Sequence, residues 1–138
     1  MAKIPRILYL EDDPDDVELL RIALARNRLD CEVIALDGRA AFLAALDAGT
    51  PDLILCDGSL PGIDGPTAVA LAKARLPRVP FILVSGAPDP TAVEACRRLG
   101  AADCLVKGDR AAIVRAVRLA LEKSPAPPGS NDPAATRD

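Results

Sequence analysis

Five short apolar runs, each followed by a segment with helical periodicity, constrain the fold of this chain more than any other feature. Each run is about four residues long and nearly continuous, which is typical of parallel strands buried on both faces. Five strand–helix units predict an α/β fold, in which a doubly wound five-stranded parallel sheet has helices on both faces and right-handed crossovers. The runs are Ile7–Leu10, Val33–Leu36, Leu53–Cys56, Phe81–Val84 and Cys104–Val106.

The segments between the runs have the end signals of helices. We expect helices over residues 14–28, 39–48, 66–76, 90–99 and 110–122. An aspartate before the first turn accepts hydrogen bonds from exposed backbone N–H groups, and a glycine suits the last turn. The predicted N-caps are Asp13, Asp37, Asp64, Asp89 and Asp109, and the predicted C-terminal glycines are Gly49 and Gly100.

The length of 138 residues suits one compact domain. We assign residues 1–123 to this domain. Residues 124–138 read SPAPPGSNDPAATRD and lack apolar periodicity, so we expect a disordered tail or a linker there. No signal peptide and no membrane-spanning apolar run is recognisable, which favours a cytoplasmic setting without a membrane partner.

Composition excludes several classes of site. The chain contains no histidine, so it has no His-ligated metal, no His general base and no phosphohistidine of its own. A net charge of −3 without a long basic run argues against direct nucleic-acid binding. The cysteines, which lack C-x-x-C spacing, are expected to be small buried apolar residues in a reducing compartment; they are Cys31, Cys56, Cys96 and Cys104.

Polar residues follow four of the predicted strands. Glu11 and Asp12 follow the first strand, and Asp57 follows the third. Ser85 follows the fourth strand, and Lys107 follows the fifth. Because ligands of open α/β sheets bind outside the carboxyl ends of the strands, we expect these side chains to form one site.

The charges of this group indicate phosphoryl chemistry. Glu11, Asp12 and Asp57 would repel one another in a partly dry cleft, and a hard divalent cation with oxygen ligands, such as Mg²⁺, would relieve this repulsion. Lys107 adds a second positive charge. Phosphoryl transfer depends mainly on positioning and charge neutralisation, and a carboxylate can act as its nucleophile, which gives an aspartyl-phosphate.

Four segments at these strand ends resemble the signature segments of response-regulator receiver domains of two-component systems, similar to chemotaxis regulators. The segments are ILYLEDDPDD, DLILCDGSLPGIDG, FILVSGA and ADCLVKGD. The resemblance covers about residues 5–122. It implies a flavodoxin-like strand order of 2-1-3-4-5.

The resemblance also implies a role for each matching residue. Asp57 corresponds to the phosphoacceptor, and Lys107 to the lysine that contacts the phosphoryl group. Ser85 corresponds to the switch hydroxyl that hydrogen-bonds the phosphoryl group. The implied ligands of Mg²⁺ or Mn²⁺ are Glu11, Asp12, Asp57 and the backbone carbonyl of Ser59.

The function implied is that of a phosphoacceptor in a phosphorelay. A histidine kinase or a histidine phosphotransfer protein would donate the phosphoryl group, and a conformational switch would signal to a protein target. Such a chain is not an enzyme on other substrates, because it assists only its own phosphorylation and dephosphorylation.

Two residues depart from the family pattern. Cys104 stands where the family usually has an aromatic residue that moves with the switch hydroxyl, and Gly108 replaces the usual proline after the lysine. We therefore expect the signal to leave through a surface other than the one this aromatic controls.

The same residues are compatible with other functions. The chain could be a pseudo-receiver that works without phosphorylation. Residues 13–17 match D-x-D-x-[TV], the pattern of haloacid-dehalogenase-like phosphatases, and a flavodoxin-like electron carrier would share the fold. We assign Asp13, Asp15 and Asp16 only to favouring the helix N-terminus, an effect of about 1 kcal/mol.

Overall fold

The predicted alternation of strands and helices is present throughout the computed structural model, which describes residues 4–122. The expected tail at 124–138 lies outside the described residues. In chain order the elements are β1 (Arg6–Leu10), α1 (Pro14–Arg26), β2 (Glu32–Leu36), α2 (Arg39–Ala48), β3 (Leu53–Asp57), α3 (Gly65–Arg75), β4 (Phe81–Ser85), α4 (Pro90–Leu99), β5 (Asp103–Val106) and α5 (Arg110–Glu122).

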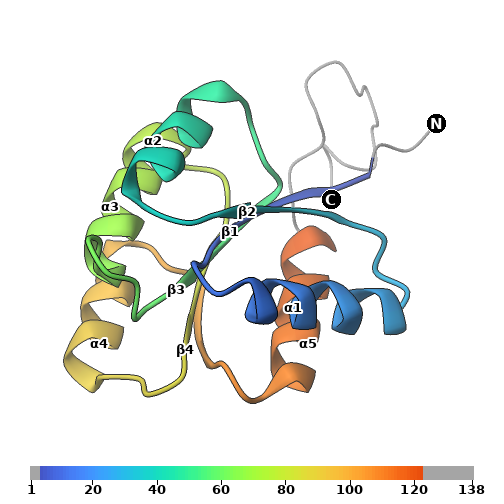
Figure 1. Cartoon of the computed structure of the whole chain (residues 1–138). Helices are drawn as coiled ribbons and strands as arrows, with labels where there is room; N and C mark the ends of the chain where they lie inside the picture. Colours follow the sequence, from blue (N-terminus) through green and yellow to red (C-terminus); the bar gives the residue numbers. More distant parts are fainter. Residues whose placement is uncertain (1–3, 123–138) are drawn as a thin grey trace.

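The strands form one sheet in the order β2-β1-β3-β4-β5, and every neighbouring pair is parallel. This confirms the predicted fold and strand order. Helices α1 and α5 cover one face of the sheet, and α2, α3 and α4 cover the other (Figure 1). None of the helices within residues 4–122 is long and apolar enough to cross a membrane.

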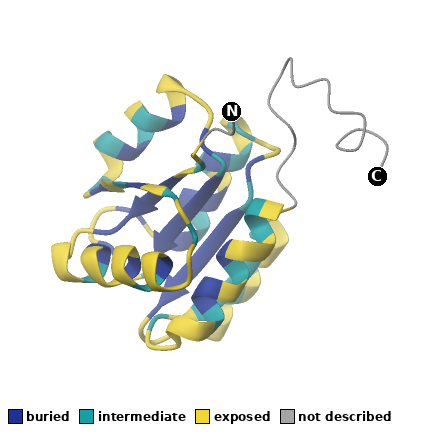
Figure 2. Cartoon of the chain, turned by 90° about the vertical axis from the view of Figure 1, so that its right-hand side faces the viewer, coloured by how far each residue is buried: buried dark blue, intermediate teal, exposed yellow. Residues whose placement is uncertain are grey.

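Strand β3 explains why two cores form. Its residues are all buried, and successive side chains of a strand point to opposite faces. Leu53 and Leu55 therefore pack with α1 and α5, whereas Ile54 and Cys56 pack with α2, α3 and α4. Figure 2 shows the central strands as the buried layer and the helices with exposed outer surfaces.

Four of the five predicted N-caps make the expected contact. The carboxylates of Asp13, Asp64, Asp89 and Asp109 each accept a hydrogen bond from a backbone N–H group in the first turn of the following helix. The prediction for Asp37 is wrong. Helix α2 begins at Arg39, so its N-cap is Gly38, which has no side chain to accept a bond. Asp37 lies one residue too early to cap this helix.

The cysteines differ in burial. Cys56 and Cys96 are buried as expected, whereas Cys31 and Cys104 are half-buried. The expectation of burial is therefore wrong for Cys31 and Cys104. For Cys104 the reason is its place on β5, the last strand of the sheet, which has a neighbouring strand on one side only. Burial raises the pKa of the Cys96 thiol to about 11, so this thiol stays protonated at neutral pH.

Candidate functional site

The carboxyl ends of four strands meet at one edge of the sheet. Backbone hydrogen bonds continue just past the strands: Glu11 N–H donates to Leu36 O at 2.9 Å and Lys107 N–H donates to Ser85 O at 2.8 Å. These bonds set the loops that follow β1 and β5. The site residues after β1, β3, β4 and β5 are therefore placed by the sheet itself.

Three carboxylates gather at this edge. One oxygen atom each of Glu11, Asp12 and Asp57 lies within 4.8 Å of the other two. Glu11 and Asp57 are buried, with 2% and 5% of their surfaces exposed, whereas Asp12 is exposed. Oxygen donors at this spacing suit a hard divalent cation, and the exposed side leaves access for water.

Lys107 supplies the positive charge among these carboxylates. Its Nζ atom lies 2.6 Å from Glu11 Oε1, 2.7 Å from Asp16 Oδ2 and 3.4 Å from Asp57 Oδ2. Burial alone lowers the pKa of Lys107, but hydrogen bonds with Asp16 and Glu11 and the charge of Asp57 outweigh it, so the pKa is raised. The ammonium group is therefore a permanent charge of the site at neutral pH.

Several groups hydrogen-bond the Glu11 carboxylate. Burial raises its pKa, while hydrogen bonds from Lys107 and from the backbone N–H of Asp13 act in the opposite direction without cancelling the shift. The Tyr9 hydroxyl donates to Glu11 Oε1 at 3.3 Å. Burial and the nearby carboxylate raise the pKa of Tyr9, so the phenol keeps its proton as the donor of this bond.

Asp57 is the last residue of β3, and its two oxygens face different groups. Oδ1 accepts a hydrogen bond from the Ser59 N–H at 3.0 Å, and Oδ2 faces Lys107. Ser59 is exposed and lies beside Asp57 as expected, although the role of its carbonyl as a metal ligand stays a prediction.

Ser85 ends the neighbouring strand and is also buried, with 6% of its surface exposed. It lies beside Gly58, where a Cβ atom would be 3.6 Å from Ser85 Oγ. Gly58, Ser59 and Ser85 line a small cavity of about 70 Å³ at the N-terminus of α4. This space has room for about two water molecules.

Asp16 is the site residue that the sequence interpretation missed. The sequence pattern assigns Asp16 only to the helix N-terminus, but its carboxylate forms the ion pair with Lys107. Helical periodicity contained the signal, because Asp16, Leu20 and Ala23 occur at i, i+4 and i+7 and so share one face of α1. Asp13, the first Asp of the phosphatase-like pattern, caps α1 instead.

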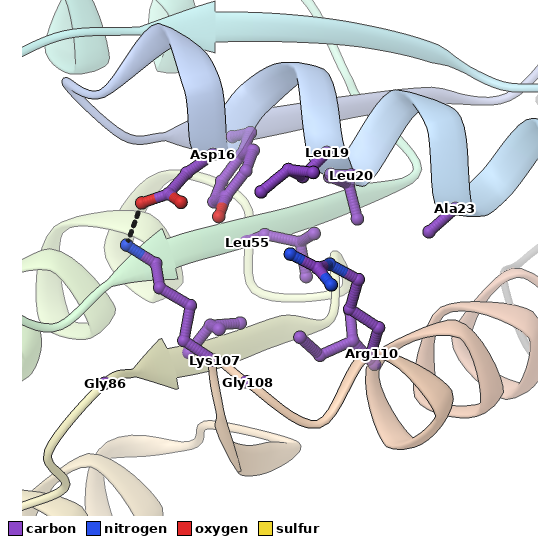
Figure 3. A pocket seen from close by; sticks show the side chains of 12 residues that line it. Asp16, Leu19, Leu20, Ala23, Leu55, Gly86, Lys107, Gly108 and Arg110 are labelled. Carbon is purple, nitrogen blue, oxygen red and sulfur yellow. Dashed lines mark hydrogen bonds and ion pairs between the residues drawn. The ribbon is translucent and has the colours of Figure 1, made fainter.

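A cavity of about 300 Å³ lies between α1 and α5 and adjoins this ion pair. Leu20, Leu55 and Ile113 contribute apolar wall, and Lys107 and Asp16 are among its polar lining residues. Figure 3 shows the ion pair at one end and the Arg110 side chain extending from α5 into the same space. The stem of Lys107 thus borders open volume rather than packed core.

A sequence model of the response regulator receiver domain matches residues 7–118. The chain is 39% identical over 106 residues to the response regulator protein FleR of Pseudomonas aeruginosa, covering 74% of this chain and 21% of FleR. It is 39% identical over 115 residues to the transcriptional regulatory protein FixJ of Azorhizobium caulinodans, covering 80% of this chain and 54% of FixJ. The chain therefore spans about a fifth to a half of these relatives.

Solved structures agree on the fold. The signal receiver domain of an HD domain-containing protein from Pseudomonas fluorescens Pf-5 superposes with a TM-score of 0.79 at 26% identity, over 88% of this chain and 90% of that one. The receiver domain of a sensor histidine kinase from Pseudomonas aeruginosa PAO1, whose structure has a magnesium ion in its active-site cleft, gives a TM-score of 0.74 at 24% identity. That match covers 87% of this chain and 99% of the kinase receiver domain, and it shows the fold alone.

Proposed function

The chain belongs to the response regulator receiver domain family, and on that premise we propose that Asp57 accepts a phosphoryl group in a two-component phosphorelay. One observation carries the proposal. A buried aspartate ends the central strand β3, with two further acidic residues and a protonated lysine around it. A solvated loop aspartate or a simple helix cap would need neither the burial nor the lysine.

The donor set fits a divalent cation. Glu11, Asp12 and Asp57 offer three carboxylate oxygens, and the Ser59 carbonyl is the fourth proposed ligand. Mg²⁺ and Mn²⁺ favour such oxygen ligands and keep some of their water. When bound, the cation supplies positive charge beside the phosphoryl oxygens. The magnesium ion in the Pseudomonas kinase receiver domain supports this assignment for the same fold.

The residues of the chain account for the transfer itself. A carboxylate oxygen of Asp57 attacks the phosphorus of a phosphohistidine on the donor protein, the P–N bond breaks, and its electron pair returns to the imidazole. Lys107 neutralises charge on the phosphoryl oxygens, and the Ser85 hydroxyl donates a hydrogen bond to one of them.

The signal follows from how these two residues are linked. Lys107 N–H donates to Ser85 O, so the loops after β4 and β5 are tied together. When Ser85 and Lys107 contact the phosphoryl group, the conformational equilibria of both loops shift together. The chain acts as a phosphoacceptor rather than as an enzyme on other substrates.

The partners follow from the same chemistry. The proposed phosphoryl donor is a histidine kinase or a histidine phosphotransfer protein, as for other receiver domains. This chain has no histidine that could carry the group itself. The target is a protein, because the net charge of −3 does not suit direct nucleic-acid binding. Relatives such as FixJ are named as transcriptional regulators, and an output of that kind would lie in a longer protein or in a docked partner.

The test is phosphorylation with acetyl phosphate and Mg²⁺, followed by intact mass. The wild-type chain should gain one phosphoryl group, and Asp57→Asn should gain none. Asp37→Asn is the matched control, because Asp37 is an exposed aspartate that follows β2 at the same edge of the sheet. It should be labelled as the wild type is.

Three results would contradict the proposal. Equal labelling of Asp57→Asn would place the phosphoryl group elsewhere. A folded wild-type chain with neither labelling nor saturable Mg²⁺ binding would be a pseudo-receiver. Repeated turnover of small phosphate esters would point to a phosphatase.

A further inference from the structure

The Asp16–Lys107 ion pair is a contact that the proposed phosphoacceptor function does not require. Asp16 comes from the first turn of α1, and 91 residues separate it from Lys107 in the sequence. Its side chain is 27% exposed, whereas those of Glu11 and Asp57 are 1% and 7% exposed. Asp16 is thus the outermost of the three carboxylates that hold Lys107.

Asp16 also differs from the other two carboxylates in what else it can bind. Glu11 and Asp57 belong to the three-carboxylate cluster, whereas Asp16 does not. A cation on that cluster competes with Lys107 for Glu11 and Asp57 but leaves Asp16 to the lysine. Arg110 lines the same cavity, yet no ion pair joins it to Asp16 among residues 4–122.

We propose that Asp16 is a positioning residue that holds the Lys107 ammonium group on the α1 side of the site before phosphorylation. Lys107 Nζ is 2.7 Å from Asp16 Oδ2 but 3.4 Å from Asp57 Oδ2, so the resting lysine is closer to α1 than to the phosphoacceptor. The inference rests on the proposed function, because it concerns the same lysine in that reaction.

Asp16 should therefore affect Mg²⁺ binding and the lifetime of the aspartyl-phosphate in opposite directions. By sharing Lys107, Asp16 leaves Glu11 and Asp57 more available to the cation, so it strengthens Mg²⁺ binding. After phosphorylation, Asp16 competes with the phosphoryl oxygens for the same ammonium group, so it shortens the life of the aspartyl-phosphate. Loss of the Asp16 charge should therefore weaken Mg²⁺ binding and lengthen the phosphorylated state.

A through-space charge effect must be separated from the contact. Asp15 is the matched control, because it is an exposed aspartate in the same helical turn. No hydrogen bond or ion pair joins its side chain to Lys107 among the described residues. Asp15→Asn removes one charge at nearly the same place without removing the ion pair, and Asp16→Glu keeps the charge and can restore the contact.

The experiment uses the full chain as wild type, Asp16→Asn, Asp16→Glu and Asp15→Asn. Calorimetric titration with Mg²⁺ alone gives the dissociation constant, and intact mass after removal of acetyl phosphate gives the lifetime of the phosphorylated form. For Asp16→Asn we expect Mg²⁺ binding roughly fivefold weaker and a lifetime roughly fivefold longer, the order of one screened unit charge at short range. Asp15→Asn should change each value by less than about twofold, since its charge is solvated and lacks the contact.

The outcomes separate this inference from the proposed function. If Asp16→Asn and Asp15→Asn behave alike, or if Asp16→Glu restores nothing, the positioning role is overturned while labelling of Asp57 in the wild type still supports the phosphoacceptor. If the folded wild type neither binds Mg²⁺ nor takes a phosphoryl group, both fall. If Asp16→Asn does not fold, Asp16→Ala measured in the same way gives the same decision.

Discussion

On the α1 side of Asp57 one ammonium group bridges three carboxylates, whereas on the α4 side the strand ends meet small and apolar groups. The α1 side is held by charge: Lys107 contacts Glu11, Asp16 and Asp57 and borders a cavity. The α4 side is held mainly by packing, because Gly65 lies against the side chains of Leu83 and Cys96, and the cavity beside it is the smaller of the two, about 70 Å³ against about 300 Å³.

This difference bears on how a signal could leave the site. Ion pairs at the edge of a cavity can change partners with little repacking, whereas close packing resists small displacements. Cys104, at the position of the usual relay aromatic, is a small and half-buried residue on the α4 side. If Asp57 is phosphorylated as proposed, this difference favours α1 and α5 as the helices that respond.

The largest expected effect comes from removing the charge on the α1 side. Lys107→Met leaves the carboxylates of Glu11 and Asp57 buried without a counter-charge, and in Mg²⁺-free buffer we expect the free energy of unfolding to fall by about 3 kcal/mol. This is near the lower end for a buried pair, because the Lys107 side chain is 24% exposed. Saturating Mg²⁺ should restore most of the loss. Urea unfolding with and without Mg²⁺ measures both values.

Lys73→Met is the control for that experiment. Lys73 is a half-buried lysine on α3 that donates to the backbone carbonyl of Val79 at 2.8 Å. Lys73→Met should lower the free energy of unfolding by the same amount with and without Mg²⁺. A Lys107→Met loss that Mg²⁺ leaves unchanged would contradict the view that charge holds the α1 side together.

The next effect tests the packing on the α4 side. A Cβ atom at Gly65 would be 3.1 Å from Leu83 Cδ1 and 3.2 Å from Cys96 Sγ, so Gly65→Ala overpacks the contact between α3 and α4. We expect the free energy of unfolding to fall by about 1–2 kcal/mol. Thermal or urea unfolding measures the change, and Mg²⁺ should not alter it.

Two variants check the cause of that loss. Gly86→Ala adds the same methyl group where no atom lies within 4 Å, so it should be nearly neutral. Cys96→Ala makes room beside Gly65, so the double variant Gly65→Ala/Cys96→Ala should lose less than the sum of the single variants. Strict additivity would argue against a steric origin.

A smaller effect concerns the start of α3. Asp64 accepts a hydrogen bond from the Thr67 N–H at 2.7 Å, and this hydrogen bonding lowers the pKa of its carboxyl group. Asp64→Ala should cost about 1 kcal/mol of unfolding free energy, the usual value of an N-cap. Because the folded pKa is lowered, the contribution is present above the unfolded value and is lost as pH falls through the folded pKa. The deficit should therefore shrink in acid, and a deficit constant down to strongly acidic pH would rule out the charged cap.

The smallest expected effect tests the route of the signal. If phosphorylation acts mainly through α1 and α5, the rate at which a thiol reagent labels Cys104 should change by less than about twofold on phosphorylation, since local opening at β5 would be unaffected. Hydrogen exchange over α1 and α5 should change in the same samples. A large change at Cys104 with none in α1 would reverse the comparison between the two sides.

The sequence predicted which side chains meet at this edge of the sheet because strand ends are local features, while the roles of these side chains stay predictions. Glu11, Asp57, Ser85 and Lys107 each stand at or directly after an apolar run, and parallel strands bring such positions to one edge. The helix caps were also predictable, because each capping aspartate contacts the helix that follows it directly in the sequence. The N-cap prediction for Asp37 failed although α2 begins at the predicted Arg39, because the residue directly before the helix is Gly38.

The remaining errors concern residues whose surroundings come from distant parts of the chain. The burial of Cys104 depends on β5 being the edge strand. The position of Asp16 in the turn after Asp12 was visible, but its partner was not, because that contact needs α1 and the loop after β5 to meet. The periodicity of α1 indicates which helix face Asp16 occupies, but it does not identify Lys107 as the partner of Asp16.

The sequence by itself determined the elements, the family and the strand-end set of carboxylates, hydroxyl and lysine, because each of these is written in short stretches with fixed periodicity. Only the tertiary structure decided which carboxylates share the one ammonium group and that a cavity adjoins them. The physical reason is range: hydrophobic period and capping act within a few residues, whereas an ion pair acts over a few ångströms between atoms that 91 residues of chain separate.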